Sequence, residues 1–530
     1  MNASKNRGAT MTTFEDIKKA LWAGADTFRD TIDAANYKDY VLSMLFVKFL
    51  SDSYKESVEE LAKLHQGIRL ERQKDNLPFR LKEEHTFDSL LANKTAANIG
   101  QKINHALTEI ERLNPILDGI FRGIDFNSQA VFGSKEQKNP MLRNLLDDFA
   151  DLDLRPKHIA TNNEQIPADV IGDAYEYMIG EFATISGKKA GSFFTPQAVS
   201  EIMAQLVEPK PKDRVYDPTC GSGSLLIRTA KKGDLKKVAI YGQEVSNSTI
   251  SLARMNMFLH NITDAKILQG DTLAQPKHLD GDGNLMKFDC IVANMPFSKD
   301  KWASGFNPGG EVVGRKDFVM EASLDRWHRF DWGIPPASKG DWAFLLHMIM
   351  SMSQSGRVAA VAPHGVLFRG ASEGRIRQEV VDKNLVDAVI GLPENLFYGT
   401  SIPACIIVFR KGRTNSDILF VDASGKDNYE KDKAKNKLRI RDIDKIVKVY
   451  RAYLSGNKKQ ANIEKYSHVA SSQEIMDNEY NLNIPRYVDT FEEEEQIDIS
   501  VVNREIEEIK GKIVKVEREM GKYLNELGLA

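Results

Sequence analysis

The sequence Asp217-Pro-Thr-Cys-Gly-Ser-Gly223 joins a short strand-like run, Arg214–Asp217, to a helical segment that begins at Leu225. Its two glycines allow the backbone to pass close to a ligand before the helix starts. Leu226 occupies the position of the third glycine of a dinucleotide-binding loop, so a pyrophosphate ligand is disfavoured. A strand, a glycine loop and a helix in this order predict an α/β domain that binds a ligand at the loop.

Short apolar runs alternate with helical segments from residue 213 onward. This alternation predicts a doubly wound, Rossmann-like α/β domain, in which ligands bind beyond the carboxyl ends of the strands. The helices expected between the strands include Leu225–Lys231, Ile250–Leu259, Trp342–Met352 and Glu373–Lys383. The expected strands are Arg214–Asp217, Val238–Gly242, Ile267–Gly270, Asp289–Ala293, Val358–Ala362, Ala388–Leu392, Ala404–Phe409 and Ile418–Val421.

The chain before this domain is predicted to be all helical. The run Tyr40–Leu50 is apolar on nearly every side, and apolar residues continue it at helical spacing to Leu61, as in a helix buried in a bundle. Asp88–Leu113 is predicted as further helix, and the turn-rich stretch 155–167 indicates a boundary. We therefore expect a helical domain over residues 1–165 and the α/β domain over residues 166–485.

Residues 486–530 form a third predicted part, a coiled-coil-like helical tail for subunit assembly. Its apolar residues recur with alternating steps of three and four, which is a heptad seam. Two interpretations remain open, packing on the chain's own domain and packing against a helix of another chain. The seam comprises Ile499, Val502, Ile506, Ile509, Ile513, Val516, Met520, Tyr523 and Leu527.

The composition is that of an ordinary globular protein of two or three domains, with 530 residues, 42% hydrophobic and 28% charged. We expect a cytoplasmic protein, because neither a long apolar run nor an N-terminal signal sequence is present. The three cysteines lack CxxC spacing and predict neither a disulfide framework nor a metal site. The net charge of −3 gives no indication of nucleic acid, and the basic run Lys431–Lys448 is most simply a solvated loop and helix.

Three acidic residues lie at the ends of successive predicted strands. Glu244 is placed to accept hydrogen bonds from ribose hydroxyls, and Asp271, which is expected to end the third strand, is placed to accept one from an adenine amino group. Each of them alone could be a helix cap or a loop anchor. Together with Asp217 they suit S-adenosyl-L-methionine, which carries an amine, a ribose and an adenine. The α/β domain is therefore predicted to be a methyltransferase domain that depends on this cofactor.

The segment Gly191-Ser-Phe-Phe-Thr-Pro-Gln197 precedes the first strand. Thr195 is a good N-cap and Pro196 a good first residue, so a helix is expected to start here. The amides of this helix start could point at the carboxylate of the cofactor. The predicted cofactor-binding residues are Ser192, Phe193, Phe194, Thr195, Pro196, Gln197, Asp217, Thr219, Gly221, Ser222, Gly223, Glu244 and Asp271, and no metal ligand is predicted.

The predicted catalytic residues are Asn294, Met295, Pro296 and Phe297, which directly follow the strand-like run Phe288–Ala293. An exocyclic amine on a base is a poor nucleophile, because its lone pair is delocalised into the ring. The Asn294 side-chain oxygen and the carbonyl of residue 295 can accept its two N–H groups, while Phe297 offers a face for the base. Asn-x-Pro alone is more often a turn, but its place after the glycine loop favours amino-methyl transfer.

These motifs, in this order, resemble those of the amino-methyltransferases that modify adenine N6 in DNA, and most closely those of the modification subunit of type I restriction-modification systems. The resemblance spans roughly residues 14 to 490. It is supported by Phe28–Tyr40, Ile171–Tyr177, Gly333–Pro336, Asp341–Phe344, Pro363–Phe368 and Leu392–Phe397, in addition to the segments above.

The resemblance implies methyl transfer from S-adenosyl-L-methionine to a flipped adenine. It also implies that two modification subunits join one specificity subunit, which reads the DNA sequence, and that a motor-nuclease subunit can join them. Only about 120 residues follow Phe409, which is little room for a target-recognition domain on this chain.

One position departs from the family, because Met295 stands where a proline is usual. Its carbonyl can still accept a hydrogen bond, but the loop loses the fixed φ of proline. Two alternatives therefore stay open beside DNA methylation. One is an enzyme acting on a protein glutamine or on RNA, and the other is a cofactor-binding assembly subunit with impaired catalysis.

Overall fold

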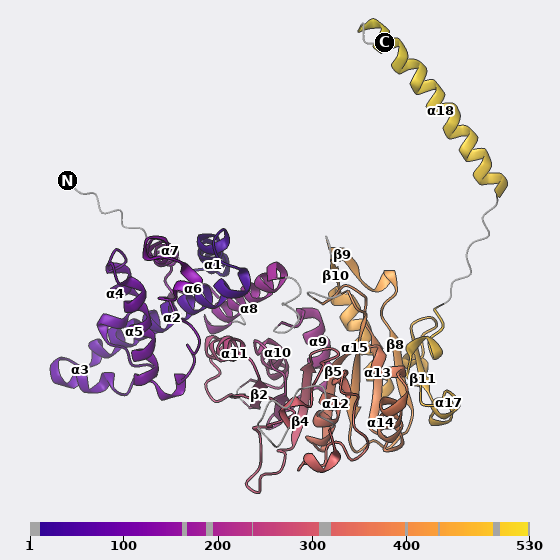
Figure 1. Ribbon diagram of the computed structural model, residues 1–530, viewed down its shortest axis with the longest axis horizontal. Helices are drawn as coiled ribbons and strands as arrows, with labels where there is room; N and C mark the ends of the chain where they lie inside the picture. The colour runs from indigo at the N-terminus through magenta and orange to yellow at the C-terminus, as the bar shows by residue number, and fades with distance from the viewer. Residues whose placement is uncertain are drawn as a thin grey trace. The chain divides into compact units, whose positions relative to one another are not determined.

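The computed structural model describes residues 11–161, 167–186, 194–235, 237–306, 320–397, 401–432, 435–490 and 499–527. It divides into two compact units, Met1–Val488 and Asp489–Ala530 (Figure 1). None of the described helices is both long enough and apolar enough to span a membrane.

A mixed β-sheet forms the centre of the larger unit. Among the described residues, nine strands compose it in the order β11-β8-β6-β7-β5-β4-β1-β2-β3. The strands are β1 Arg214–Asp217, β2 Ala239–Glu244, β3 Lys266–Gln269, β4 Phe288–Asn294, β5 Met352–Pro363, β6 Val386–Gly391, β7 Ala404–Arg410, β8 Ile418–Asp422 and β11 Ser467–Ala470.

The order of the strands locates a ligand-binding edge. Strands β3, β2, β1, β4 and β5 are parallel neighbours. The chain builds outward from β1 to β3 on one side and then returns to add β4 and β5 on the other. The order therefore reverses between β1 and β4, which is the switch point where open α/β sheets bind ligands. Strand β7 is antiparallel to β5 and β6.

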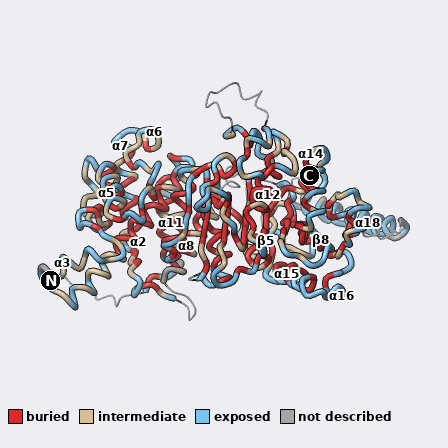
Figure 2. The backbone as a smooth tube through the Cα atoms, turned by 90° about the horizontal axis from the view of Figure 1, so that it is seen from below, coloured by how far each residue is buried: buried red, intermediate tan, exposed pale blue. Residues whose placement is uncertain are grey.

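Both faces of this sheet are buried, which explains why its strands are nearly continuous apolar runs. Figure 2 shows the buried residues gathered in the strands and the adjoining helices. Two apolar cores fill the two faces. One core includes α9 Gln197–Val207, α10 Ser224–Lys232 and α15 Ile440–Leu454, and the other includes α12 Asp341–Met350, α13 Gly365–Phe368 and α14 Ala371–Asp382.

The N-terminal region is helical, as expected, and has its own apolar core. The long α2 contributes Val41, Leu45 and Phe46 to that core, each fully buried. The helices are α1 Phe14–Arg29, α2 Ala34–Leu64, α3 Gly67–Lys74, α4 Phe87–Ala92, α5 Ile99–Leu113, α6 Gln129–Phe132, α7 Lys135–Asp148 and α8 Pro167–Ser186. The predicted continuous helix Asp88–Leu113 is wrong, because residues 93–98 separate α4 from α5.

Two helices connect the helical region to the sheet. Helix α8 lies within the limits expected for the α/β domain, yet Tyr175 and Phe182 pack in the helical core. Helix α11, Asn247–Leu259, has two buried faces. Its Leu252 and Met255 belong to the helical core, while Ala253 belongs to a core of the sheet.

The predicted strands are all present, with changes at their ends. Strand β1 has the predicted limits, whereas β5 begins earlier, at Met352, where the preceding helix was expected to end. Strand β3 ends at Gln269, so Asp271 follows the strand after a glycine and does not end it. Strand β11 and a small hairpin, β9 Glu430–Asp432 with β10 Lys435–Lys437, were not predicted.

The smaller unit contains one described helix, α18, Ile499–Glu526. The predicted helical tail is therefore confirmed. The apolar seam is exposed along this helix, from 38% at Val502 to 66% at Tyr523. The side chain of Ile499 lies outside the described residues.

Candidate functional site

The glycine loop after β1 depends on backbone conformations that favour glycine. Gly221 has φ +53° and Gly223 has φ +79°, both in the left-handed region. Gly223 is also the N-cap of α10, and a Cβ atom there would lie 2.9 Å from Cε of Met257. Any other residue at 223 would therefore both strain the loop and contact α11.

Asp217 is the last residue of β1 and is 1% exposed. Its Oδ1 accepts a hydrogen bond of 2.8 Å from the amide of Thr219. Burial raises the pKa of this carboxyl to about 8, against the opposing effect of the Thr219 amide. An ionised Asp217 is therefore costly without a partner, and a cation placed beside it would favour the charged form.

Glu244 is the last residue of β2, the neighbour of β1. Its Oε2 accepts a 3.1 Å hydrogen bond from the amide of Gly221, and its Oε1 accepts one of 2.9 Å from the amide of Ser246. Burial raises the pKa of Glu244, and these amides counteract the rise. The carboxylate thus ties the end of β2 to the glycine loop.

Asp271 follows β3, the next strand along the edge. Its Oδ1 accepts hydrogen bonds from the amides of Leu273, at 2.9 Å, and Ala274, at 3.2 Å. Oδ2 of Asp271 lies 3.4 Å from the position that a Cβ at Gly305 would take. The three predicted carboxylates are therefore at the ends of three adjacent strands, two at a last residue and one just beyond it.

The start of α9 differs from the prediction in one detail. The N-cap is Pro196 and the helix begins at Gln197, so Thr195 does not cap it. Phe194 and Thr195 lie at the mouth of the glycine loop, where they line the same small pocket as Asp217. The predicted Ser192 and Phe193 lie outside the described residues.

This small pocket combines the ends of β1 and β4 with Phe194 and Thr195, which precede α9. Glu244 does not line the pocket, but it binds the glycine loop through the amide of Gly221. The other predicted residues outside the pocket are Asp271, Gly223, Pro196, Gln197, Met295, Pro296 and Phe297. Its lining is Phe194, Thr195, Asp217, Thr219, Cys220, Gly221, Ser222, Ser224, Leu225 and Asn294. Cys220, Ser224 and Leu225 were not predicted, although Cys220 lies within the glycine loop and the other two begin the helix that follows it.

The predicted catalytic residues begin at the carboxyl end of β4. Asn294 is the last residue of that strand, and its side chain makes no hydrogen bond within the described residues. Met295 is 2% exposed and packs in a core of the sheet, whereas Pro296 is exposed. The four residues therefore do not share one environment, and Met295 has a packing role that the sequence did not indicate.

Phe297 contacts an aromatic ring from a distant segment. The ring of Phe397, in the loop after β6, lies 6.1 Å from that of Phe297, with an angle of 70° between the planes. Sequence reasoning gave Phe397 no role, because nothing local links it to residue 297. Contacts from other segments also hold the end of this loop, since the amide of Ser298 donates a 2.6 Å hydrogen bond to Oδ1 of Asp341.

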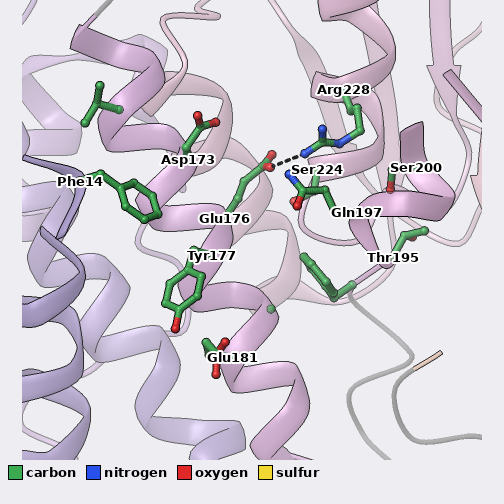
Figure 3. A pocket seen from close by; sticks show the side chains of 13 residues that line it. Phe14, Asp173, Glu176, Tyr177, Glu181, Thr195, Gln197, Ser200, Ser224 and Arg228 are labelled. Atoms are coloured by element: carbon green, nitrogen blue, oxygen red, sulfur yellow. Dashed lines mark ion pairs between the residues drawn. The ribbon is translucent and has the colours of Figure 1, made fainter. Parts of the chain in front are cut away.

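A second cavity, of about 580 Å³, lies beside this pocket (Figure 3). Helices α1, α8, α9 and α10 supply most of its described lining, and the segment before α9 supplies the rest. Phe194, Thr195 and Ser224 line both hollows. An ion pair of 3.6 Å between Glu176 and Arg228 crosses it. Its described lining includes no residue from the carboxyl ends of β1 to β4, so the larger hollow is not the predicted chemical site.

Comparison with known proteins identifies the family of this chain. A family model described as N-6 DNA Methylase matches residues 167–496, and the HsdM N-terminal domain model matches residues 17–149. The MpnII methylase subunit of a type I restriction enzyme from Mycoplasma pneumoniae is 34% identical, over 94% of this chain and 93% of that protein. The MjaVIII methylase subunit from Methanocaldococcus jannaschii is 30% identical, over 96% and 84%.

A solved structure is similar along most of the chain. The crystal structure of the type I restriction-modification system methyltransferase subunit from Streptococcus thermophilus is 34% identical and covers 90% of this chain and 100% of its own, with a TM-score of 0.76. These matches confirm the resemblance found in the sequence and decide for DNA over protein or RNA as the substrate. The chain belongs to the N-6 DNA methylase family, as a type I restriction enzyme methylase subunit, and is an adenine-specific DNA methyltransferase.

Proposed function

We propose that this chain transfers a methyl group from S-adenosyl-L-methionine to N6 of an adenine flipped out of DNA, at the edge between β1 and β4. The observation that carries this proposal is that Asp217 and Asn294 line one pocket at the switch point of the sheet. Asp217 is one of the predicted cofactor-binding residues, and Asn294 is predicted to contact the base.

The residues present fit S-adenosyl-L-methionine. Asp217 keeps one carboxylate oxygen without a hydrogen bond among the described residues. Burial makes its ionised form costly, and the ammonium group of the cofactor would offset that cost. Glu244 would accept from the ribose hydroxyls and Asp271 from the adenine amino group. Thr195 and Phe194, with Thr219 and Ser222, would enclose the amino-acid end. When bound, this cofactor supplies an electrophilic methyl group on a sulfonium.

The chain's own part in the reaction is to orient the target amine. Oδ1 of Asn294 would accept one N–H and the carbonyl of residue 295 the other, so that the nitrogen lone pair points at the methyl carbon. The rings of Phe297 and Phe397 would bound the space for the base. A proton on the methylated nitrogen then leaves to solvent, and no strong base is required.

We propose that two copies of this chain assemble with one specificity subunit, which selects the DNA sequence. We also propose that a motor-nuclease subunit can join this assembly and that the complex works in the cytoplasm. The exposed seam of α18 supports a docking role, because a long apolar stripe is stable when a second helix covers it. The seam would pack against a helix of the specificity subunit.

Tritium transfer from labelled S-adenosyl-L-methionine to DNA tests this function, with and without the specificity subunit. We expect transfer to adenine only with both chains present. Cofactor binding without any transfer would instead support an assembly subunit with impaired catalysis. A chain truncated after Val488 should bind the cofactor but no longer co-purify with the specificity subunit, and full assembly by the truncated chain would exclude α18 as the contact.

A further inference from the structure

Arg329 is a fully buried arginine next to the predicted adenine-binding loop. It pairs with Asp325, four residues earlier, at 2.8 Å, and both side chains are 0% exposed. Aromatic rings surround the guanidinium, with Trp327 at 5.0 Å and Phe330 at 5.2 Å from its central carbon. A buried ion pair of this kind contributes little net stability, because desolvation offsets the attraction. Its geometry is therefore the more informative feature.

The remaining donors of Arg329 reach the loop that follows β3. Nη2 donates a 2.6 Å hydrogen bond to the carbonyl of Leu273, and Nη1 donates one of 3.3 Å to the carbonyl of Thr272. Thr272 in turn donates from Oγ1 to the carbonyl of Pro218, at 2.5 Å. One guanidinium thus holds both residues after Asp271, and Thr272 joins that loop to the loop after β1.

A buried histidine extends the connection to β1. Nδ1 of His347 lies 3.1 Å from Nη1 of Arg329, and its Nε2 lies 3.1 Å from the hydroxyl of Tyr216. Burial, together with Arg329, lowers the pKa of His347 well below its usual value, so the ring is neutral. Because arginine can only donate, Nδ1 accepts and Nε2–H donates to Tyr216, which directly precedes Asp217.

We propose that Arg329 is a positioning residue that sets the selectivity of the site for the 6-amino group of the cofactor's adenine. It holds the loop after β3 through the carbonyl of Leu273, and in this loop the amides of Leu273 and Ala274 donate to Asp271 and aim its carboxylate. The fixed fork of a guanidinium suits this role, because a lysine cannot donate to both carbonyls and to Asp325 in a set geometry. This inference rests on the proposed role of Asp271.

The test compares two cofactor analogues, S-adenosyl-L-homocysteine and S-inosyl-L-homocysteine, which differ in the amino group that Asp271 would recognise. Calorimetry on the full chain gives the ratio of their dissociation constants. In the natural protein the inosyl analogue should bind at least about tenfold more weakly, as for one hydrogen bond to a charged group. Asp271→Ala should reduce this ratio to about one.

The double variant Asp325→Asn with Arg329→Met should lower the ratio at least about threefold. Its matched control is Lys48→Met with Asp52→Asn, which removes another buried ion pair of residues four apart, 2.7 Å long, in the helical core. The control should lose stability but keep the natural ratio. If the Arg329 double variant does not fold, Arg329→Lys is the variant to test. It should also lower the ratio of the two dissociation constants.

A folded Arg329 variant with the natural ratio would overturn the positioning role while leaving Asp271 in place. A natural ratio in Asp271→Ala would instead remove Asp271 from adenine recognition, and both proposals would fail together. If the ratio of dissociation constants also fell in the Lys48 control, selectivity would depend on general stability. That result would also overturn the role of Arg329.

Discussion

The two halves of the site are built over different distances along the chain. On the cofactor half, Asp217 and Asp271 receive amide hydrogen bonds from residues two or three positions later, and Glu244 reaches the neighbouring glycine loop. On the catalytic half, Ser298 and Phe297 depend on Asp341 and Phe397, far along the sequence. Local hydrogen bonds thus aim Asp217 and Asp271 within their own loops, and long-range hydrogen bonds then join these loops. On the catalytic half, the contacts described all come from distant segments.

Among these substitutions, we expect the largest loss of activity on the catalytic half. Asn294→Ala should lower the rate of methyl transfer about 10²–10³-fold, by analogy with the removal of one group that stabilises a transition state. The dissociation constant of S-adenosyl-L-methionine should stay within about twofold, because Asn294 orients the base and not the cofactor. Single-turnover transfer and calorimetry measure the two quantities. Natural turnover by this variant would remove Asn294 from the reaction.

Substitutions on the cofactor half should weaken cofactor binding without lowering the transfer rate at saturating cofactor. Glu244→Ala should weaken S-adenosyl-L-methionine by roughly 1.5–3 kcal/mol, the value of a hydrogen bond that involves a charged group. At saturating cofactor the transfer rate should recover. Glu379→Ala, which changes an exposed glutamate of α14, is the matched control. Unchanged affinity in a folded Glu244→Ala protein would contradict the assignment.

We expect cofactor affinity to depend on pH, because the pKa of Asp217 is raised. Burial raises its pKa to about 8 in the free protein, so most of the carboxyl is protonated at pH 7. A bound ammonium favours the ionised form, so affinity should rise as the pH approaches 8. At higher pH the affinity should fall again, because an α-amino group itself loses its proton with a pKa of about 7.7–8.0. Calorimetry at several pH values measures this, and Asp217→Asn should remove the rise. A profile without this rise in the natural protein would mean that Asp217 does not face the ammonium.

The smallest effect is expected at Met295. Met295→Pro restores the residue usual in the family and should change the transfer rate by no more than about threefold, because proline stiffens the loop but leaves some of the buried space unfilled. The comparison with Met295→Ala separates the two contributions, since alanine removes the packing without stiffening the backbone. A rate far below that of Met295→Ala would show that this loop needs its flexibility.

The contrast between the halves also explains what the sequence could predict. The strands, the glycine loop and the three carboxylates follow from hydrophobic patterns and short spacings, and β1 has the predicted limits. The contacts of Phe397 and Asp341 could not be predicted, because their partners lie far away in the sequence. Arg329 has a near partner in Asp325, but its bonds to the loop after β3 come from a distant segment. Strand β11 was missed for a related reason, since its middle residues are only half-buried at the edge of the sheet and lack an apolar run.

Helix α11 has a consequence for the engineering of this protein. Its two faces are shared between the helical core and the sheet, and Asn256 on it donates a 3.0 Å hydrogen bond to the carbonyl of Ser222 in the glycine loop. Cutting the chain before α8 would remove α2, whose Phe46 packs on Phe258, and would uncover part of the helix that supports this loop. We therefore expect the smallest stably folded fragment that binds the cofactor to include the N-terminal helices, so that the α/β part cannot be transplanted alone.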